Sequence, residues 1–323
     1  MVQSVYSVEE LNVLLKEEED ILDEIDQYKQ SNLDATNEVN EEEMVQMLEK
    51  LEHSQEKQQL IIQNELKNDD KMEVLAERLA KIKTLEEKLQ QLRERQEVSV
   101  NGTVDIITPM LPMLHTLCIG PGLGRHPLVF NSVEKVIKKA MELNLALVLD
   151  ADALFMLSMK QYTSLFAELR DYEKCVMTPN VMEMRRLNDA LSSSLGTADD
   201  GINGENNNNN IIVQKGNIDT VRNIHHVMHC EEEGGLKRSG GIGDVLAGTI
   251  SAFMAWNTLL ETDSDREDTN SKQRQRVFAC WTACVAVKKA TKLSYGKKRR
   301  SMAALDVMGE IGTVLDDIEQ SLV

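Results

Sequence analysis

The first 97 residues contain no glycine, proline, cysteine or tryptophan, although the chain of 323 residues has 17 Gly and 5 Pro. Glycine and proline supply most of the tight turns that a globular domain needs. The segment holds 12 Lys and Arg against 26 Asp and Glu, so it carries −14 of the net charge of −18. It is therefore predicted to be long acidic helix, and residues 98–323, which contain every Gly, Pro and Cys, are predicted to form the globular part.

Other absences exclude whole classes of protein. No run approaches the roughly 18 apolar residues of a membrane-spanning helix, and the acidic N-terminus resembles neither a secretory signal nor a mitochondrial transit peptide. Five scattered cysteines are too few for a disulfide framework, so we expect a reducing compartment and a cytoplasmic protein, with a mitochondrial location left open. The acidic balance argues against nucleic acid, and we interpret the basic run 297–300 as a solvated loop. Neither nucleic acid nor a membrane is an expected partner.

The acidic segment has the spacing of a coiled coil. Ser7 and Glu10 form a capping-box signature at its start, and breaks are expected at 31–40 and 68–70. Apolar residues recur every three or four positions at Leu11, Leu14, Ile21, Ile25 and Tyr28, and again at Met72, Leu75, Leu79, Ile82, Leu85, Leu89 and Leu92. Such helices must bury this stripe, on another copy of the chain or on each other. We expect a homo-oligomer, and the sequence does not identify any other partner of the coiled coil.

The globular part alternates strand and helix patterns. Strands are predicted at 115–120, 145–149, 176–178 and 211–214, and helical patterns lie at 133–143, 153–169 and 244–256. This order predicts an α/β domain with a parallel sheet, whose ligands bind at the carboxyl ends of the strands. Two polar segments, 195–210 and 261–276, are predicted to be disordered loops.

Motifs that can bind phosphate follow three of these strands. Gly120–Gly124 (GPGLG) allows a close backbone approach, although a plain tight turn fits equally well. Asn180 and Glu183 can hold Mg²⁺ through water, or can simply cap the next helix. Lys215 begins a sharp turn, 215–219, that could bring a cation to a phosphate.

The segment 234–248 (GGLKRSGGIGDVLAG) is the most informative. Gly240, Gly241 and Gly243 precede a helix, so their backbone N–H groups can form an anion hole at its positive end. Lys237 and Arg238 add positive charge. Asp244 lies in the first turn, where a carboxylate can accept the proton of an attacking hydroxyl.

These motifs, with DADAL (150–154), TPNVMEMRRL (178–187), VQKGNID (213–219) and RRSMAALDVMGEIG (299–312), resemble the ATP-dependent NAD(P)H-hydrate dehydratases of the ribokinase-like superfamily. The resemblance spans about residues 104–320. It implies a three-layer ribokinase-like domain with a mostly parallel sheet. It also implies that the (S) epimer of hydrated NADH or NADPH is dehydrated with ATP, which yields ADP and phosphate, and that Mg²⁺ accompanies the ATP.

The resemblance also implies roles for individual residues. Asp244 is the expected catalytic base and also a substrate contact. The other expected contacts to the hydrate are Gly122, Gly124, Asn180, Val181, Met182, Glu183, Met184, Arg185 and Arg186. The expected ATP contacts are Lys215, Gly216, Asn217, Ile218, Asp219, Gly234, Gly235, Leu236, Lys237, Arg238, Ser239, Gly240, Gly241, Ile242 and Gly243.

The sequence departs from the family pattern before Val104. Family members have a glycine-rich strand and a GAPYFAA-like helix there, and the acidic segment takes their place in this chain. An N-terminally truncated domain with an unpaired sheet edge is therefore expected. Two alternatives stay open: a ribokinase-like small-molecule kinase, and a catalytically impaired coiled-coil protein that carries a dehydratase fragment.

His225, His226, His229 and Cys230 resemble a metal cluster in their spacing. In the family this segment is one strand of a hairpin, which would place 225 and 229 on one side and 226 on the other. We therefore expect no metal site among the protein's side chains.

Overall fold

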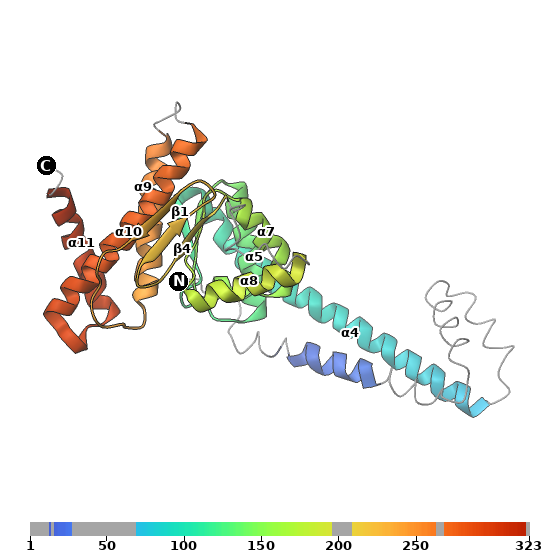
Figure 1. The fold of residues 1–323 in the computed structure, drawn as a ribbon. Helices are drawn as coiled ribbons and strands as arrows, with labels where there is room; N and C mark the ends of the chain where they lie inside the picture. The colour runs from blue at the N-terminus through green and yellow to red at the C-terminus, as the bar shows by residue number, and fades with distance from the viewer. Residues whose placement is uncertain (1–12, 14–15, 28–68, 196–208, 263–267, 321–323) are drawn as a thin grey trace. The chain divides into compact units, whose positions relative to one another are not determined.

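The computed structural model describes residues 13, 16–27, 69–195, 209–262 and 268–320 (Figure 1). The expected capping box at Ser7, the break at 31–40 and most of the segment 195–210 lie outside these residues. The chain divides into two compact units, Met1–Thr103 and Val104–Val323. Within the described residues, no helix combines the length and apolar character needed to cross a membrane.

The described residues of the first unit form a helical stretch at 16–27 and most of α4 (Asp69–Ile107), whose last residues belong to the second unit. Ile25 packs with Leu85 and Leu89 of α4, and all three side chains are buried. Ion pairs join Glu24 to Lys81 and Glu17 to Arg95, so the two stretches run antiparallel. The described part of the apolar stripe is thus buried within one chain, whereas self-association between chains stays a prediction.

The second unit is built on a six-stranded sheet in the order β1-β2-β3-β4-β5-β6. The strands are β1 (Thr116–Ile119), β2 (Ala146–Leu149), β3 (Cys175–Met177), β4 (Ile211–Gln214), β5 (Asp219–Arg222) and β6 (Val227–Cys230). β1 to β4 are parallel, and β5 and β6 continue the sheet as an antiparallel hairpin. The predicted α/β class and mostly parallel sheet are confirmed.

Helices cover both faces of this sheet (Figure 1). Leu147 and Leu149 face one layer, and Ala146 and Val148 face the other, because successive residues of a strand point to opposite sides. The first layer comprises α5 (Pro127–Glu142), α6 (Asp152–Leu157), α7 (Thr163–Asp171) and α8 (Val181–Leu195). The second comprises α9 (Ile242–Thr262) and α10 (Thr269–Lys298), with α11 (Ala304–Gln320) packed on α10.

Short 3₁₀ helices at Thr108–Met113, Lys160–Tyr162 and Arg299–Ser301 join some of these elements. The helix expected over 153–169 is therefore divided into α6, a 3₁₀ turn and α7. Met159 has an extended backbone (φ −87°, ψ 139°), which interrupts the helical hydrogen bonds at that point.

The prediction of a disordered loop over 261–276 was wrong for the residues that the structure describes. Glu261 belongs to α9, and 269–276 form the start of α10. The prediction relied on the charged and polar composition of this segment. In the structure Arg276 is 5% exposed, and its guanidinium pairs with Glu261 at 2.7 Å and with Glu173 at 3.2 Å. A polar sequence was therefore compatible with a buried ion-paired helix end.

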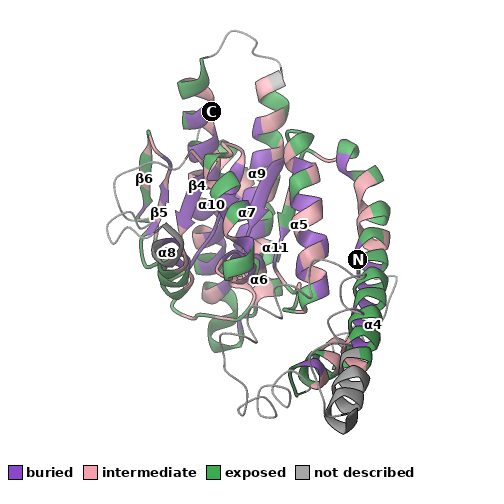
Figure 2. Cartoon of the chain, turned by 90° about the vertical axis from the view of Figure 1, so that its right-hand side faces the viewer, coloured by how far each residue is buried: buried purple, intermediate pink, exposed green. Residues whose placement is uncertain are grey.

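The two edges of the sheet differ from its centre. β1 pairs with β2 alone among the described strands, which is the open edge that the sequence led us to expect. Figure 2 shows β4 coloured mostly as buried, whereas β6 alternates between exposed and more buried residues. The buried centre explains why β2 and β4 are continuous apolar runs.

Candidate active site

The carboxyl ends of β1 to β4 meet at one edge of the sheet, and backbone hydrogen bonds join them. Asp150 N–H donates to the Ile119 carbonyl at 3.0 Å, and Lys215 N–H donates to the Pro179 carbonyl at 2.9 Å. Gly120 has φ +124°, and a Cβ there would collide with the Asp150 carbonyl oxygen. Only glycine fits, so the GPGLG turn is built by its contact with the end of β2.

Asp150 is the most deeply buried charged group at this edge. The residue is 1% exposed, and its Oδ1 lies 2.6 Å from the Lys215 ammonium. Glu183 Oε2 lies 4.0 Å from the same ammonium. The next residue, Ala151, holds φ +48°, a strained conformation for a residue with a side chain. Such strain is concentrated at functional sites.

The glycine-rich start of α9 reaches this pair. A Cβ on Gly243 would lie 3.7 Å from Lys215 Nζ and 3.9 Å from Asp150 Oδ2. Gly241 has φ +87°, and Asp244 in the first turn of α9 is exposed beside it. The positive end of α9, the Lys215 ammonium and a carboxylate therefore border one space at the carboxyl edge.

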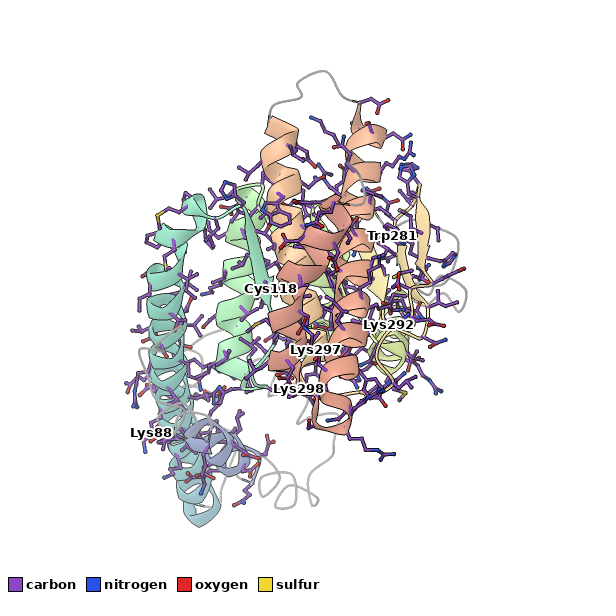
Figure 3. The ribbon with its side chains drawn as sticks, turned by 90° about the vertical axis from the view of Figure 1, so that its left-hand side faces the viewer. Lys88, Cys118, Trp281, Lys292, Lys297 and Lys298 are labelled. Atoms are coloured by element: carbon purple, nitrogen blue, oxygen red, sulfur yellow. The ribbon has the colours of Figure 1, made fainter. Side chains whose placement is uncertain are left out.

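Cys118 lies one residue before the end of β1 and is exposed. The helix α9, which carries Asp244 in its first turn, packs against β1 and β2. Figure 3 shows Cys118 beside the helix of the second layer that begins at this edge.

The turn 215–219 is held by its own aspartate. Gly216 N–H donates to Asp219 Oδ1 at 2.8 Å, and Lys288 of α10 lies 3.4 Å from Asp219 Oδ2. Burial raises the pKa of the Asp219 carboxyl, while the Gly216 N–H and Lys288 oppose that shift. Asp219 therefore shapes the turn from within rather than facing solvent.

The loop 234–243 is anchored at its start. Gly235 N–H donates to Thr291 Oγ1 at 2.9 Å, and a Cβ on Gly235 would collide with the Thr291 carbonyl. Lys237 Nζ donates to the Met302 carbonyl at 2.6 Å, so this ammonium ties the loop to the residues before α11. Leu236, Arg238 and Gly240 are exposed.

Asn180 and Glu183 cap the N-terminus of α8, which is one of the two roles that their spacing suggested. Asn180 Oδ1 accepts the N–H groups of Met182 and Glu183 at 2.9 Å, and Glu183 Oε2 accepts the Asn180 N–H at 2.8 Å. Val181, Met182, Arg185 and Arg186 are exposed, whereas Met184 is 3% exposed in the hydrophobic core.

The GPGLG turn leads into a cationic and aromatic cluster. Gly124 N–H and Arg125 Nε both donate to the Asp152 carboxylate, at 3.1 and 2.9 Å. The guanidinium of Arg125 lies 4.1 Å from the centre of the Phe155 ring, and that of Arg186 lies 5.6 Å from it. This edge of the candidate site can therefore offer cations and a ring face to a ligand.

The comparisons with known proteins bear on this arrangement. The family model described as NAD(P)H-hydrate dehydratase matches residues 70–311. The chain belongs to the NAD(P)H-hydrate dehydratase family. An "ATP-dependent (S)-NAD(P)H-hydrate dehydratase" of Dictyostelium discoideum is 30% identical over 68% of this chain and 72% of that protein, and one of Rattus norvegicus is 32% identical over 68% and 62%.

A third relative with the same description, from Heterostelium pallidum, is 33% identical over 65% of this chain, which spans 52% of that protein. The chain thus spans between about half and three quarters of the length of these family members. A solved ribokinase-like superfamily protein of Enterococcus faecalis has 19% identity and a TM-score of 0.45, over 67% of this chain and 68% of that one.

In this chain, the histidines of the segment 225–230 make separate contacts. His226 Nε2 lies 2.9 Å from Asn270 Oδ1, and His229 Nδ1 lies 3.2 Å from Thr220 Oγ1. β6 begins only at Val227, so His225 and His226 precede the strand. Among the residues with described placement, no three His, Cys, Asp or Glu side chains gather as a metal site would require.

The sequence did not identify three features of the family member's site. Asp150 belongs to the DADAL motif, and its position directly after a buried strand was the available signal. Arg125 and Phe155 required the fold to bring them together. Lys288 lies within the long helix α10, about 70 residues after the turn that it contacts.

Proposed function

We propose that this protein uses ATP to dehydrate the (S) epimer of hydrated NADH or NADPH, which restores the reduced cofactor. The observation that supports this proposal most is the position of Gly243, in the first turn of α9, against the Lys215 ammonium, with Asp244 in the same helical turn. Family membership supports the same activity. Because the chain spans only part of its relatives, the activity is proposed for it rather than transferred.

The ATP phosphates are proposed to bind between the Gly240–Gly243 loop and Lys215. N–H groups at the positive end of α9 stabilise negative charge, and the Lys215 ammonium lies close to that loop. The rest of the nucleotide is assigned to the turn 215–219 and the loop beginning at Gly234. Lys237 serves by holding this loop, because its ammonium already binds the Met302 carbonyl.

Asp244 is proposed as the general base. The hydroxyl oxygen of the hydrate attacks the terminal phosphorus of ATP, its proton passes to the Asp244 carboxylate, and ADP leaves. The resulting phosphate ester then eliminates inorganic phosphate with loss of a ring proton, which regenerates the dihydronicotinamide. In this elimination the electron pair of the broken ring C–H bond forms the new double bond, the proton passes to solvent, and the hydroxyl oxygen leaves as part of the phosphate.

The hydrate is proposed to lie over the GPGLG turn and the start of α8. Gly122 and Gly124 have positive φ, and no other atom lies within 4 Å of the position that a Cβ would take, so a ligand can approach their backbone closely. Arg186 and Phe155 offer charge and stacking to a dinucleotide. Met184 is left out of this proposal because its side chain lies in the core.

Magnesium is proposed to arrive with the nucleotide. Mg²⁺ that bridges phosphates needs only one or two protein carboxylates. The carboxylates of Asp150 and Glu183 lie at the carboxyl edge of the sheet, where the phosphates are proposed to bind, and they would hold the ion partly through water. The bound ion would neutralise phosphate charge during transfer.

The decisive experiment compares the wild type with Asp244→Asn. The asparagine preserves shape and removes the base, so kcat should fall by about 10²–10⁴-fold while the Kd for ATP changes little. Turnover is measured as recovery of reduced-nicotinamide absorbance from hydrated cofactor with ATP and Mg²⁺. Asp317→Asn, the same change at an exposed position of α11, is the matched control.

Equal rates in the wild type and Asp244→Asn would remove Asp244 from the mechanism. A phosphorylated organic product without free phosphate would instead support the small-molecule kinase. A wild type that binds ATP but never restores absorbance would support an impaired dehydratase fragment.

A further inference from the structure

Lys288 lies in the second half of α10, on the face of the helix that packs against the sheet. Its neighbours Cys284, Val287 and Ala290 are buried, and the Lys288 side chain is itself only 13% exposed. A lysine is rarely buried this far unless its ammonium is fully used. None of the motifs in the sequence accounts for it.

Its ammonium joins the two ends of the β5–β6 hairpin. Lys288 Nζ donates to the Asn217 carbonyl at 2.6 Å and to the Cys230 carbonyl at 3.1 Å, and it lies 3.4 Å from Asp219 Oδ2. Asp219 in turn accepts the Gly216 N–H. The Lys288 ammonium therefore holds the turn 215–219 through the backbone carbonyl of Asn217 and through the carboxylate of Asp219.

The next turn of α10 holds the second nucleotide loop. Thr291 Oγ1 donates to the Lys288 carbonyl at 2.7 Å and accepts the Gly235 N–H at 2.9 Å. The turn 215–219 and the loop 234–243 are thus attached to adjacent turns of one helix. Figure 3 shows Trp281 and Lys292 on the same helix, which lies beside the hairpin.

We infer that Lys288 is a positioning residue for ATP: it holds the turn 215–219 in the geometry that places the Lys215 ammonium and the Gly216 N–H toward the nucleotide. This inference rests on the proposed function, because it assigns the turn to ATP. Lys288 does not touch the phosphates, since its donors are directed to protein carbonyls and Asp219.

The test replaces Lys288 by methionine, which keeps the aliphatic stem and removes the charge. Loss of charge-assisted bonds that shape the turn should raise the Kd and KM for ATP about tenfold or more, with kcat changed less than threefold. Amide exchange at Gly216 should accelerate. Lys288→Arg keeps a donor and should recover most of the affinity.

Lys292→Met is the matched control on the next turn of the helix. Its ammonium pairs with exposed Glu233 at 3.3 Å and not with the turn 215–219, so neither ATP affinity nor Gly216 exchange should change. A melting temperature for each variant separates a general loss of stability from a specific loss of ATP binding.

The outcomes distinguish this inference from the proposed function. If the wild type restores the cofactor and Lys288→Met keeps its KM for ATP, the inference fails and the function stands. If the wild type binds ATP without turnover and Lys288→Met binds it more weakly, the positioning role stands and the function fails. If the wild type does not bind ATP, both are wrong.

Discussion

Glycines within one loop are required for different physical reasons. Gly235 is required by packing, because a Cβ would collide with the Thr291 carbonyl, whereas Gly240 has nothing within 4 Å of an added Cβ. Gly241 combines a positive φ with a contact to Ala304. The loop therefore contains one glycine whose replacement probes the ligand rather than the fold.

We predict that Gly240→Val weakens ATP binding by at least tenfold and leaves the melting temperature within about 2 °C. The valine would fill open space that the proposed phosphates need. Gly235→Val should instead destabilise the protein by about 1–3 kcal/mol through overpacking. Titration calorimetry and thermal unfolding of both variants provide the measurement. Undiminished affinity in Gly240→Val would show that this loop is not the anion hole.

His126 provides a pH-dependent contribution at the start of α5. Its Nδ1 accepts the Leu128 N–H at 3.3 Å, and its buried Nε2 has no hydrogen-bond partner among the described residues. Burial lowers the pKa of His126 below 6.5, so the folded state favours the neutral ring. As pH falls through 6.5, the unfolded chain takes up the proton first, and the stability contributed by this residue is progressively lost.

We predict that His126→Asn reduces the loss of unfolding free energy between pH 7.5 and pH 5. Asparagine retains an N-cap acceptor without a titrating ring. His126→Ala should show the same reduced pH dependence. Its free energy of unfolding should be about 1 kcal/mol lower than that of His126→Asn at both pH values, because alanine cannot cap the helix. Urea unfolding at the two pH values measures both. Identical pH dependence in wild type and His126→Asn would exclude this contribution.

The positions of candidate site residues could be predicted from the sequence where a motif occupies consecutive residues. The glycines, Lys215 and Asp244 lie at the expected strand and helix ends. The contact between Lys215 and Asp150 was not predictable, because 65 residues separate them and only the parallel order of β2, β3 and β4 brings them together.

At the level of elements, the paired helices of the first unit show what apolar spacing can and cannot specify. The stripe predicted helix, but equal spacing serves pairing within one chain or between chains. Leu85 and Leu89 of α4 meet Ile25, with Leu85 only 1% exposed. The charged pairs that flank this contact set the antiparallel direction.

We predict that Leu85→Ala removes most of the amide-exchange protection of residues 16–27. Truncation of a buried leucine typically costs about 2–5 kcal/mol. This loss is expected to exceed the free energy with which so few side chains hold the two helical stretches together. Protection of β2 and β4 should stay unchanged. Lys88→Ala, at an exposed position of the same helix (Figure 3), is the control. Retained protection in Leu85→Ala would mean that other contacts hold the pair.

At the scale of the whole second unit, sequence predicted the strands but not their full order. The apolar pattern of β1 alone does not distinguish an edge strand from a central one, and the open edge was expected only from the family resemblance. The β5–β6 hairpin followed from family resemblance, and its direction in the sheet required the structure. α9 then spans the sheet from Asp244 at the carboxyl edge to Glu261 at the opposite edge.

That opposite edge is held by a buried charge cluster. Arg276 Nε lies 2.7 Å from Glu261 Oε1, and its Nη1 lies 3.2 Å from Glu173 Oε2, just before β3. The cluster therefore joins α9, α10 and the sheet far from the proposed chemistry. At 1.5 Å per residue, Glu261 is about 25 Å along α9 from Asp244.

We predict that Arg276→Met lowers the free energy of unfolding by about 3–5 kcal/mol, because it leaves the Glu261 carboxylate buried without its cation. The double variant Arg276→Met with Glu261→Met should lose much less, since the one carboxylate left without its partner is Glu173, whose side chain is 37% exposed and can be solvated. Both variants should keep wild-type kcat at temperatures where they are folded, because Asp244 lies at the other end of α9. Urea unfolding of the wild type, Arg276→Met, Glu261→Met and the double variant gives the coupling free energy between the two side chains. A double variant as unstable as Arg276→Met would locate the stability in packing of the arginine stem rather than in charge pairing.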